Sequence, residues 1–286
     1  MFLLAPAGSC DDARQHGAGK APVWSPSGEI LGRLALKDVN GVTLYSFANG
    51  STVRLRPIPV PPGERGTIRI APSFDQLAVT KSDDVGSFVI RKVPTGEERV
   101  VRLPSERVVD LGWDADGSRV CAVTESGTIY WVAAHDGDAA PIRLTTLRCK
   151  PTPTSRGTAF VKDVVAVRCD KGTCLHGPGG TRTVAAAGTQ VGGESFFFIR
   201  KNSLWQADLT MSSPVPICSP GRAYAFAHGF VVRNDGQFVI YDRPKTSPMQ
   251  LSSNGFEWVL LRVRDGAECL LGDLGSLDDV IAWTKE

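Results

Sequence analysis

A short phrase that recurs along the chain constrains its fold more than any other feature. It begins with glycine or asparagine, continues with a small or polar residue, and ends in a short apolar or aromatic stretch. Its copies are Gly41–Tyr45, Gly86–Ile90, Gly127–Trp131, Gly172–Leu175, Asn202–Trp205, Gly236–Ile240 and Gly266–Leu270. Successive copies start 30 to 45 residues apart, and periods of this size are typical of repeat architectures built from one supersecondary unit. We therefore expect seven units.

Each unit contains more than one apolar run, and tight-turn residues separate the runs. Arg119–Val123 precedes the turn Thr124–Gly127, and Gly229–Arg233 precedes a turn that ends at Gly236. Gly and Asn tolerate the positive φ of hairpin turns. A further element comes earlier in the first three units, at Val23–Gly28, Ile70–Asp75 and Gly112–Gly117. The pattern predicts an all-β fold, a seven-bladed β-propeller of four-stranded antiparallel blades.

Three segments carry a resemblance to the WD-repeat family. They are Trp24–Gly28, Trp113–Gly117 and Gly127–Gly137. The family usually places Gly-His before the first strand and Trp-Asp at the end of the third. Here Trp131 is followed by Val132, and Tyr241–Asp242 is the nearest substitute. The resemblance covers about residues 20–275 and implies a propeller that acts as a protein-interaction scaffold in a larger complex, although the propeller fold hosts many roles.

The chain is expected to form one domain over residues 1–286. Its 30 Gly and 19 Pro are spread along the whole length, so no linker separates two domains. Propellers usually close by joining the two chain ends in one blade, and Phe2–Ala5 and Asp279–Trp283 are short strand candidates for this closure. Residues 1 to about 20 would then supply a closing strand and a polar loop. No apolar run reaches the length of a transmembrane helix.

Seven cysteines leave the redox compartment open. A local disulfide between Cys169 and Cys174 is sterically possible, whereas Cys121 and Cys269 lie in apolar strands and suit buried thiols. No pair of cysteine motifs has zinc-site spacing. Ala7–Ser9 before Cys10 resembles the end of a bacterial lipoprotein signal but lacks a basic region. We expect a cytoplasmic protein with reduced thiols; the alternative is a lipid-anchored cell-envelope protein whose true start lies upstream of Met1.

Catalytic motifs are missing from the sequence. There are four His, and no HExxH, GxSxG or Walker-type motif occurs. Asp163, Glu194 and Asp279 are the candidate ligands of a channel metal, but they have no partners at matched blade positions. The segment Asp114–Ser118 begins like a calcium loop but lacks the later ligands, so a hairpin turn is predicted. We expect no enzyme activity, cofactor or metal; the alternative is a propeller hydrolase with a metal in its central channel.

A basic residue precedes the first strand of most units. These residues are Lys20, Arg65, Arg107, Arg156 and Arg222. Loops that enter the innermost strands of a propeller emerge on one face, so five cations would concentrate positive potential there although the net charge is only +2. Arg suits carboxylates and phosphates. We predict that this face binds an acidic or phosphorylated partner protein; alternatively, Glu64 and Glu106 neutralise the ring, or water solvates it. Sequence-specific nucleic-acid binding is not expected.

Overall fold

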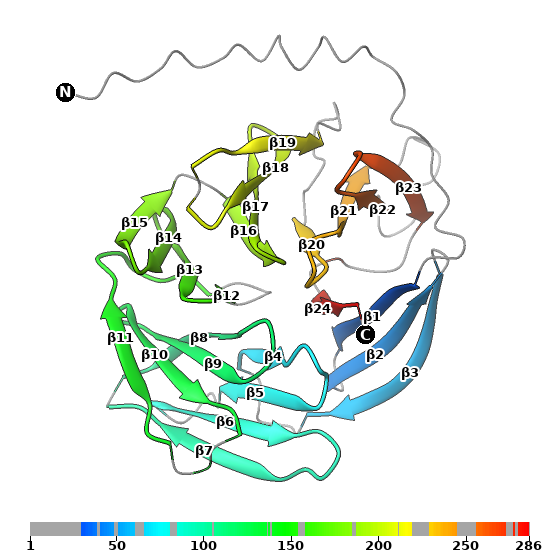
Figure 1. Ribbon diagram of the computed structural model, residues 1–286. Coiled ribbons are helices and arrows are strands. Elements are labelled where there is room, and N and C mark those ends of the chain that lie inside the picture. The colour runs from blue at the N-terminus through cyan, green and yellow to red at the C-terminus, as the bar shows by residue number, and fades with distance from the viewer. Residues whose placement is uncertain are drawn as a thin grey trace, which may run out of the picture.

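The computed structural model describes residues 30–38, 41–48, 51–60, 66–80, 85–104, 106–135, 137, 139–153, 158–184, 187–210, 212–218, 229–244, 256–272, 277 and 280–285. Over these residues, all the elements are strands, from β1 to β24. They form six four-stranded antiparallel sheets, arranged around a central axis like the blades of a propeller (Figure 1). The predicted propeller of four-stranded antiparallel blades is confirmed.

The first three blades are named in chain order, with their strands given from the axis outward. Blade 1 contains β24 (Val280–Thr284), β1 (Ile30–Asp38), β2 (Gly41–Ala48) and β3 (Ser51–Pro59). Blade 2 contains β4 (Ile68–Ile70), β5 (Gln76–Thr80), β6 (Ser87–Lys92) and β7 (Glu98–Arg102). Blade 3 contains β8 (Val108–Trp113), β9 (Arg119–Thr124), β10 (Thr128–Ala133) and β11 (Ile142–Thr146).

The other three blades follow the same order. Blade 4 contains β12 (Ala159–Val161), β13 (Val164–Cys169), β14 (Gly172–Gly177) and β15 (Gly180–Val184). Blade 5 contains β16 (Ala187–Gly192), β17 (Ser195–Arg200), β18 (Ser203–Asp208) and β19 (Val215–Cys218). Blade 6 contains β20 (Phe230–Val232), β21 (Phe238–Pro244), β22 (Phe256–Arg262) and β23 (Ala267–Gly272).

The expected count of seven blades is wrong, because two of the seven phrases lie in one sheet. In blades 1 to 5 the phrase marks the turn before the third strand, whereas Gly236 precedes the second strand of blade 6 and Gly266 precedes its fourth. Both glycines have positive φ, +74° and +68°. A tight turn needs this conformation wherever it occurs in a blade, so the phrase reports a turn and does not report which strands the turn joins.

The ring is closed by the C-terminal strand. Strand β24 pairs with β1 and becomes the innermost strand of blade 1, in the register Arg33↔Thr284 to Leu36↔Val280. The Trp283 indole donates a hydrogen bond of 2.7 Å to the Leu31 carbonyl and packs at 5.8 Å against the Phe47 ring. The predicted strand Phe2–Ala5 lies outside the described residues.

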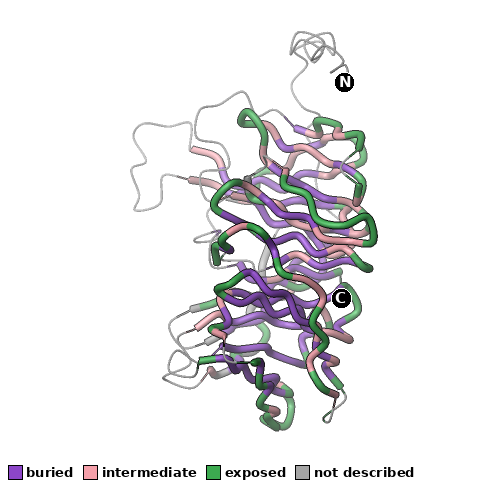
Figure 2. The backbone as a smooth tube through the Cα atoms, turned by 90° about the vertical axis from the view of Figure 1, so that its left-hand side faces the viewer, coloured by how far each residue is buried: buried purple, intermediate pink, exposed green. Residues whose placement is uncertain are grey.

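The core consists of apolar layers between neighbouring blades. One cluster joins residues of blades 2 and 3 around Phe88 and Leu111, and the other neighbouring pairs have equivalent clusters. Alternate side chains of a strand point to opposite faces, and both faces of a blade are covered here. Phe196 therefore packs toward blade 4 while Phe197 packs toward blade 6. In Figure 2 buried residues run through the strands and exposed residues gather at the turns.

Candidate binding site at the channel mouth

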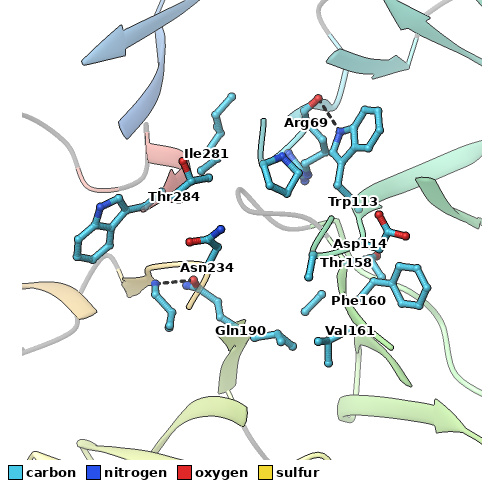
Figure 3. A pocket seen from close by; sticks show the side chains of 18 of the residues that line it. Arg69, Trp113, Asp114, Thr158, Phe160, Val161, Gln190, Asn234, Ile281 and Thr284 are labelled. Carbon is cyan, nitrogen blue, oxygen red and sulfur yellow. Dashed lines mark hydrogen bonds between the residues drawn. The ribbon is translucent and has the colours of Figure 1, made fainter. Parts of the chain in front are cut away.

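The six innermost strands surround a cavity of about 160 Å³ on the propeller axis. It is lined by residues of β4, β8, β12, β16, β20 and β24, and Figure 3 shows their side chains around a common opening. The volume is below the roughly 300–1,000 Å³ of typical small-molecule pockets. The cavity has room for a side chain of a docked segment rather than for a complete cofactor.

The cavity lies toward the end of the channel where the innermost strands finish. Its lining includes the turns that follow these strands, with Pro72 after β4, Ala115 after β8, Gly193 after β16 and Asn234 after β20. All innermost strands run in the same direction through a propeller. Residues that precede them, such as Arg107 before β8, therefore lie toward the opposite end of the channel.

Close approach of the innermost strands keeps the channel narrow. A Cβ atom placed on Gly112 of β8 would lie 2.0 Å from the Thr158 carbonyl oxygen. The Thr158 amide donates a hydrogen bond of 3.1 Å to the Leu111 carbonyl in the same region. Blades 3 and 4 can thus approach at this point only because residue 112 has no side chain.

A buried ion pair in the channel wall links blades 2 and 3. The Arg69 guanidinium of β4 donates a hydrogen bond from Nη2 to Asp110 Oδ1 of β8 at 2.8 Å, and Arg69 Nε donates to the Leu111 carbonyl at 3.2 Å. The Thr158 hydroxyl of blade 4 donates to Asp110 Oδ2 at 3.3 Å. The Trp113 indole donates to the Arg69 carbonyl at 3.1 Å. Three successive blades are therefore joined by one polar network.

Burial shifts the pKa values of both members of this ion pair. It raises the pKa of the Asp110 carboxyl, and the opposing effects are the Arg69 charge and hydrogen bonds from Leu111 and Thr158. The same desolvation lowers the pKa of Arg69, opposed by Asp110. Each buried charge depends on the other for compensation, so these groups are committed to the wall of the channel.

The other polar groups of the cavity come mainly from blades 5, 6 and 1. Gln190 accepts a hydrogen bond from the Val232 amide at 3.1 Å and donates another to the Phe230 carbonyl. The Asn234 side-chain oxygen accepts from the Lys285 amide at 3.0 Å. Thr284 lines the cavity, and its hydroxyl is buried without a hydrogen-bond partner within the described part of the chain.

The structure locates one of the five basic residues proposed as a ring. Arg107 is exposed directly before β8, and its carbonyl accepts a hydrogen bond of 2.8 Å from the Glu125 amide. Lys20, Arg65, Arg156 and Arg222 lie outside the described residues, as does Glu64. The ring therefore stays a prediction.

Glu106, which could neutralise the positive charge of the basic residues, forms hydrogen bonds with two hydroxyl groups. Its carboxylate accepts hydrogen bonds from Ser126 at 2.5 Å and from Thr124. These hydrogen bonds, Ser126 first, hold the pKa of Glu106 below its usual value. No salt bridge joins it to Arg107 among the described residues.

Two of the three candidate ligands of a channel metal, Asp163 and Glu194, are described by the structure, and it does not bring them together. Asp163 is exposed in the turn between β12 and β13, and Glu194 is an exposed residue that forms a 2.6 Å ion pair with Lys162. Asp279 lies outside the described residues. The Asp114–Ser118 segment is the predicted hairpin turn, with Gly117 at φ +75° and the Asp114 carboxylate bound to Ser118 and Arg119.

The disulfide of the structure is not the local Cys169–Cys174 pair that the sequence makes sterically possible. A disulfide joins Cys149 and Cys169, while Cys174 is free, as are Cys121, Cys218 and Cys269. The expectation of reduced thiols therefore does not hold for Cys149 and Cys169. Cys149 lies 20 residues before its partner, in the connection from blade 3 to blade 4, and no local spacing in the sequence indicates this contact.

Sequence reasoning also missed the Arg69, Asp110 and Thr158 network. The available signal was a charged residue in the middle of an apolar strand, as in Ile68-Arg69-Ile70 and Val109-Asp110-Leu111. Such residues are rarely buried without a partner, so two of them in neighbouring innermost strands could have been paired.

The fold places the chain among six-bladed β-propellers. TolB from Acinetobacter baumannii is similar with a TM-score of 0.50 and 12% identity, covering 85% of this chain and 67% of that one. Oligogalacturonate lyase from Vibrio parahaemolyticus is similar with a TM-score of 0.55 and 10% identity, covering 87% and 78%. These likenesses show the fold alone. No family model and no curated protein sequence matches the chain. No helix among the described residues could cross a membrane.

Proposed function

We propose that the protein is a non-catalytic interaction scaffold, a WD-repeat-like subunit of a larger assembly that binds a segment of a partner protein at the channel mouth. The observation that carries the proposal is that the charged residues of the channel wall are paired with one another, as in Arg69–Asp110 and Asp114–Arg119. The remaining lining combines apolar residues such as Phe160, Val191, Val232 and Ile281 with uncharged polar ones such as Gln190 and Asn234.

Such a lining favours docking over chemistry. A catalytic site needs groups that are available to transfer protons or to attack a substrate, whereas Arg69 and Asp110 are already committed to each other. An apolar side chain that enters the cavity would be removed from water. Blades of paired strands hold the site rigid, which reduces the ordering cost of binding.

A second docking surface of the same proposal lies at the opposite end of the channel. There the basic residues Lys20, Arg65, Arg107, Arg156 and Arg222 would attract an acidic or phosphorylated segment. The exposure of Arg107 supports this part of the proposal.

A cavity-blocking variant tests the channel mouth. Ala115 is exposed on the turn after β8 and lines the cavity, so Ala115→Trp should fill the opening without altering the core. Ala140→Trp is the matched control, because Ala140 is exposed and does not line the cavity. Partners are first identified by affinity purification from native cells with mass spectrometry, and their binding is then titrated with purified components.

The expected result is a loss of at least about tenfold in affinity, or 1.4 kcal/mol, for Ala115→Trp with no change for Ala140→Trp. Combined reversal of Arg65, Arg107 and Arg222 to Glu tests the other surface. If all these variants fold and bind every partner as the unaltered protein does, the proposed docking sites are wrong.

The Cys149–Cys169 disulfide favours a second candidate, an extracytoplasmic propeller with a lipid anchor. Disulfides persist in oxidising compartments and are rare in the cytosol. Intact cells are quenched in acid, and free thiols are alkylated before and after reduction. If Cys149 and Cys169 react only after reduction, the cell-envelope candidate gains support; if both are free in cells, the cytoplasmic proposal does.

A further inference from the structure

A cluster of three cysteine sulfurs lies between blades 3 and 4, away from the channel cavity. Cys169 ends β13 and Cys174 lies in β14, where it pairs with Val167. Residues 167 and 169 share one face of β13, so Cys169 and Cys174 are diagonal neighbours on that face. Cys149 reaches them from the connection that follows β11. This connection is fastened to β13 by hydrogen bonds from Thr152 to Arg168 and from Asp170 to Lys150.

The third sulfur lies beside the disulfide, within reach of both its atoms. Cys174 Sγ is 2.6 Å from Cys149 Sγ and 3.2 Å from Cys169 Sγ. A thiolate that exchanges with a disulfide must approach along the line of the bond, from beyond one end. Cys174 has similar distances to both sulfurs, so the three atoms form a compact triangle. A triangle of three sulfurs is the arrangement that one metal ion can cap.

The surroundings suit a bound metal. Among the described residues this is the one group of three His, Cys, Asp or Glu side chains whose ligand atoms lie together, all within 4.8 Å. Cys169 and Cys174 are buried in an apolar cluster with Val165 and Val167, which excludes competing water. Cys149 is half-buried, so its side of the cluster can admit a fourth ligand from solvent.

We propose that Cys149, Cys169 and Cys174 form a site for one zinc ion, which is open in the reduced protein and closed by the Cys149–Cys169 disulfide. Cysteine thiolates are common ligands of zinc ions in proteins, and they bind zinc in tetrahedral geometry. Zn–S bonds of about 2.3 Å in tetrahedral geometry place sulfurs about 3.7 Å apart, so the three side chains need only rotate outward. Water completes the coordination.

Reduction of the disulfide opens the site. A dithiol reductant gives two electrons and two protons to the disulfide, which becomes the Cys149 and Cys169 thiols, and the reductant becomes its own disulfide. Zn²⁺ then replaces the protons of the three thiols, and three protons are released to solvent. Oxidation of the same pair by a disulfide oxidant reverses the first step and removes two of the three ligands.

Zinc titration of the purified full chain tests the proposal. Protein reduced with a thiol-free reductant and protein left oxidised are titrated with Zn²⁺ against a chromophoric chelator, and Co²⁺ serves as a spectroscopic probe of thiolate ligation. Reduced protein should bind one Zn²⁺ per chain and show a sulfur-to-cobalt charge-transfer band. Oxidised protein should show neither.

Two variants separate the cluster from the other thiols. Cys174→Ser should weaken Zn²⁺ binding by at least about 100-fold, because removal of a direct ligand should cost at least as much as the 10–100-fold typical of outer-shell partners. Cys269→Ser removes a half-buried thiol of blade 6 and should bind as the unaltered protein does. Circular dichroism reports folding in every sample.

Three results would overturn the proposal. Reduced, folded protein could bind no Zn²⁺, Cys174→Ser could bind it as tightly as the unaltered chain, or the reduced protein could lose its fold whether or not Zn²⁺ is present. In each of these cases the cluster is a structural disulfide with a neighbouring buried thiol.

Discussion

Arg69 and Asp110 face each other across the boundary between blades 2 and 3, and both charges are almost fully removed from water. Their 2.8 Å contact is extended to blade 4 through the Thr158 hydroxyl. A buried pair of this kind adds little net stability compared with apolar residues of the same size, but each member becomes costly when the other is removed. The pair therefore couples the two blades at this point of the channel wall.

Removal of Asp110 should strongly destabilise the fold. Asp110→Ala leaves the Arg69 guanidinium buried without compensation, and we expect a loss of about 3–5 kcal/mol in the free energy of unfolding. Urea denaturation followed by circular dichroism measures it. The double variant Arg69→Met with Asp110→Leu should recover most of the loss. Lys92→Met, which breaks the exposed Lys92–Glu97 pair, should cost less than about 1 kcal/mol. A similarly small effect of Asp110→Ala would contradict the assignment.

Gly112→Ala should separate blades 3 and 4. The added Cβ would lie 2.0 Å from the Thr158 carbonyl oxygen, and this oxygen belongs to the backbone and cannot rotate away. We expect a loss of about 1–3 kcal/mol or more. Gly137→Ala is the control, because a Cβ at Gly137 meets nothing within 4 Å, and its effect should stay within about 0.5 kcal/mol. Thermal unfolding compares the two, and equal melting temperatures would refute this role of Gly112.

Trp283 should be required for ring closure. Its indole donates to the Leu31 carbonyl and packs against Phe47, residues that come from the other end of the described chain. Trp283→Ala leaves a cavity and an unpaired carbonyl, with an expected cost of about 3–5 kcal/mol. Leu270→Ala, at a side chain 52% exposed on β23, should change stability by less than about 0.5 kcal/mol. If denaturant midpoints of the two variants coincide, closure does not depend on Trp283.

Asp208 should give stability a defined pH dependence in acid. Hydrogen bonds from the Ser212 side chain, from Thr210 and from the Ser212 amide lower the pKa of Asp208 to about 2. Because the folded-state pKa lies below the unfolded value of about 3.9, the stabilisation is complete above the unfolded pKa and is lost as the pH falls toward 2. Asp208→Asn should therefore lower the melting temperature near pH 7 and have no effect near pH 2. A constant difference across that range would exclude the assignment, and NMR titration of the carboxyl carbon reads the pKa directly.

The sequence indicated the propeller because its signals are local. Turns such as Asp114–Gly117 and short apolar strands such as Arg119–Thr124 span a few residues, and the geometry of the turns follows from the conformational freedom of glycine.

The candidate site could be predicted only in part. That loops and innermost strands would surround a channel followed from the fold class, but the cavity lies at the end opposite Arg107, the one proposed basic residue that the structure describes. Its lining comes from six segments between Arg69 and Thr284, and single apolar residues in different strands carry no mark of a shared opening.

By itself the sequence determined the strand-turn unit, its repetition and the antiparallel four-stranded blade. Tertiary structure decided that there are six blades, that β24 closes the ring, that Arg69 pairs with Asp110, and that Cys149 joins Cys169. These outcomes depend on hydrogen bonds and contacts between residues from 20 to more than 240 positions apart. A glycine can adopt positive φ in any turn of a blade, so only the pairing of whole strands could assign Gly236 and Gly266 to one blade.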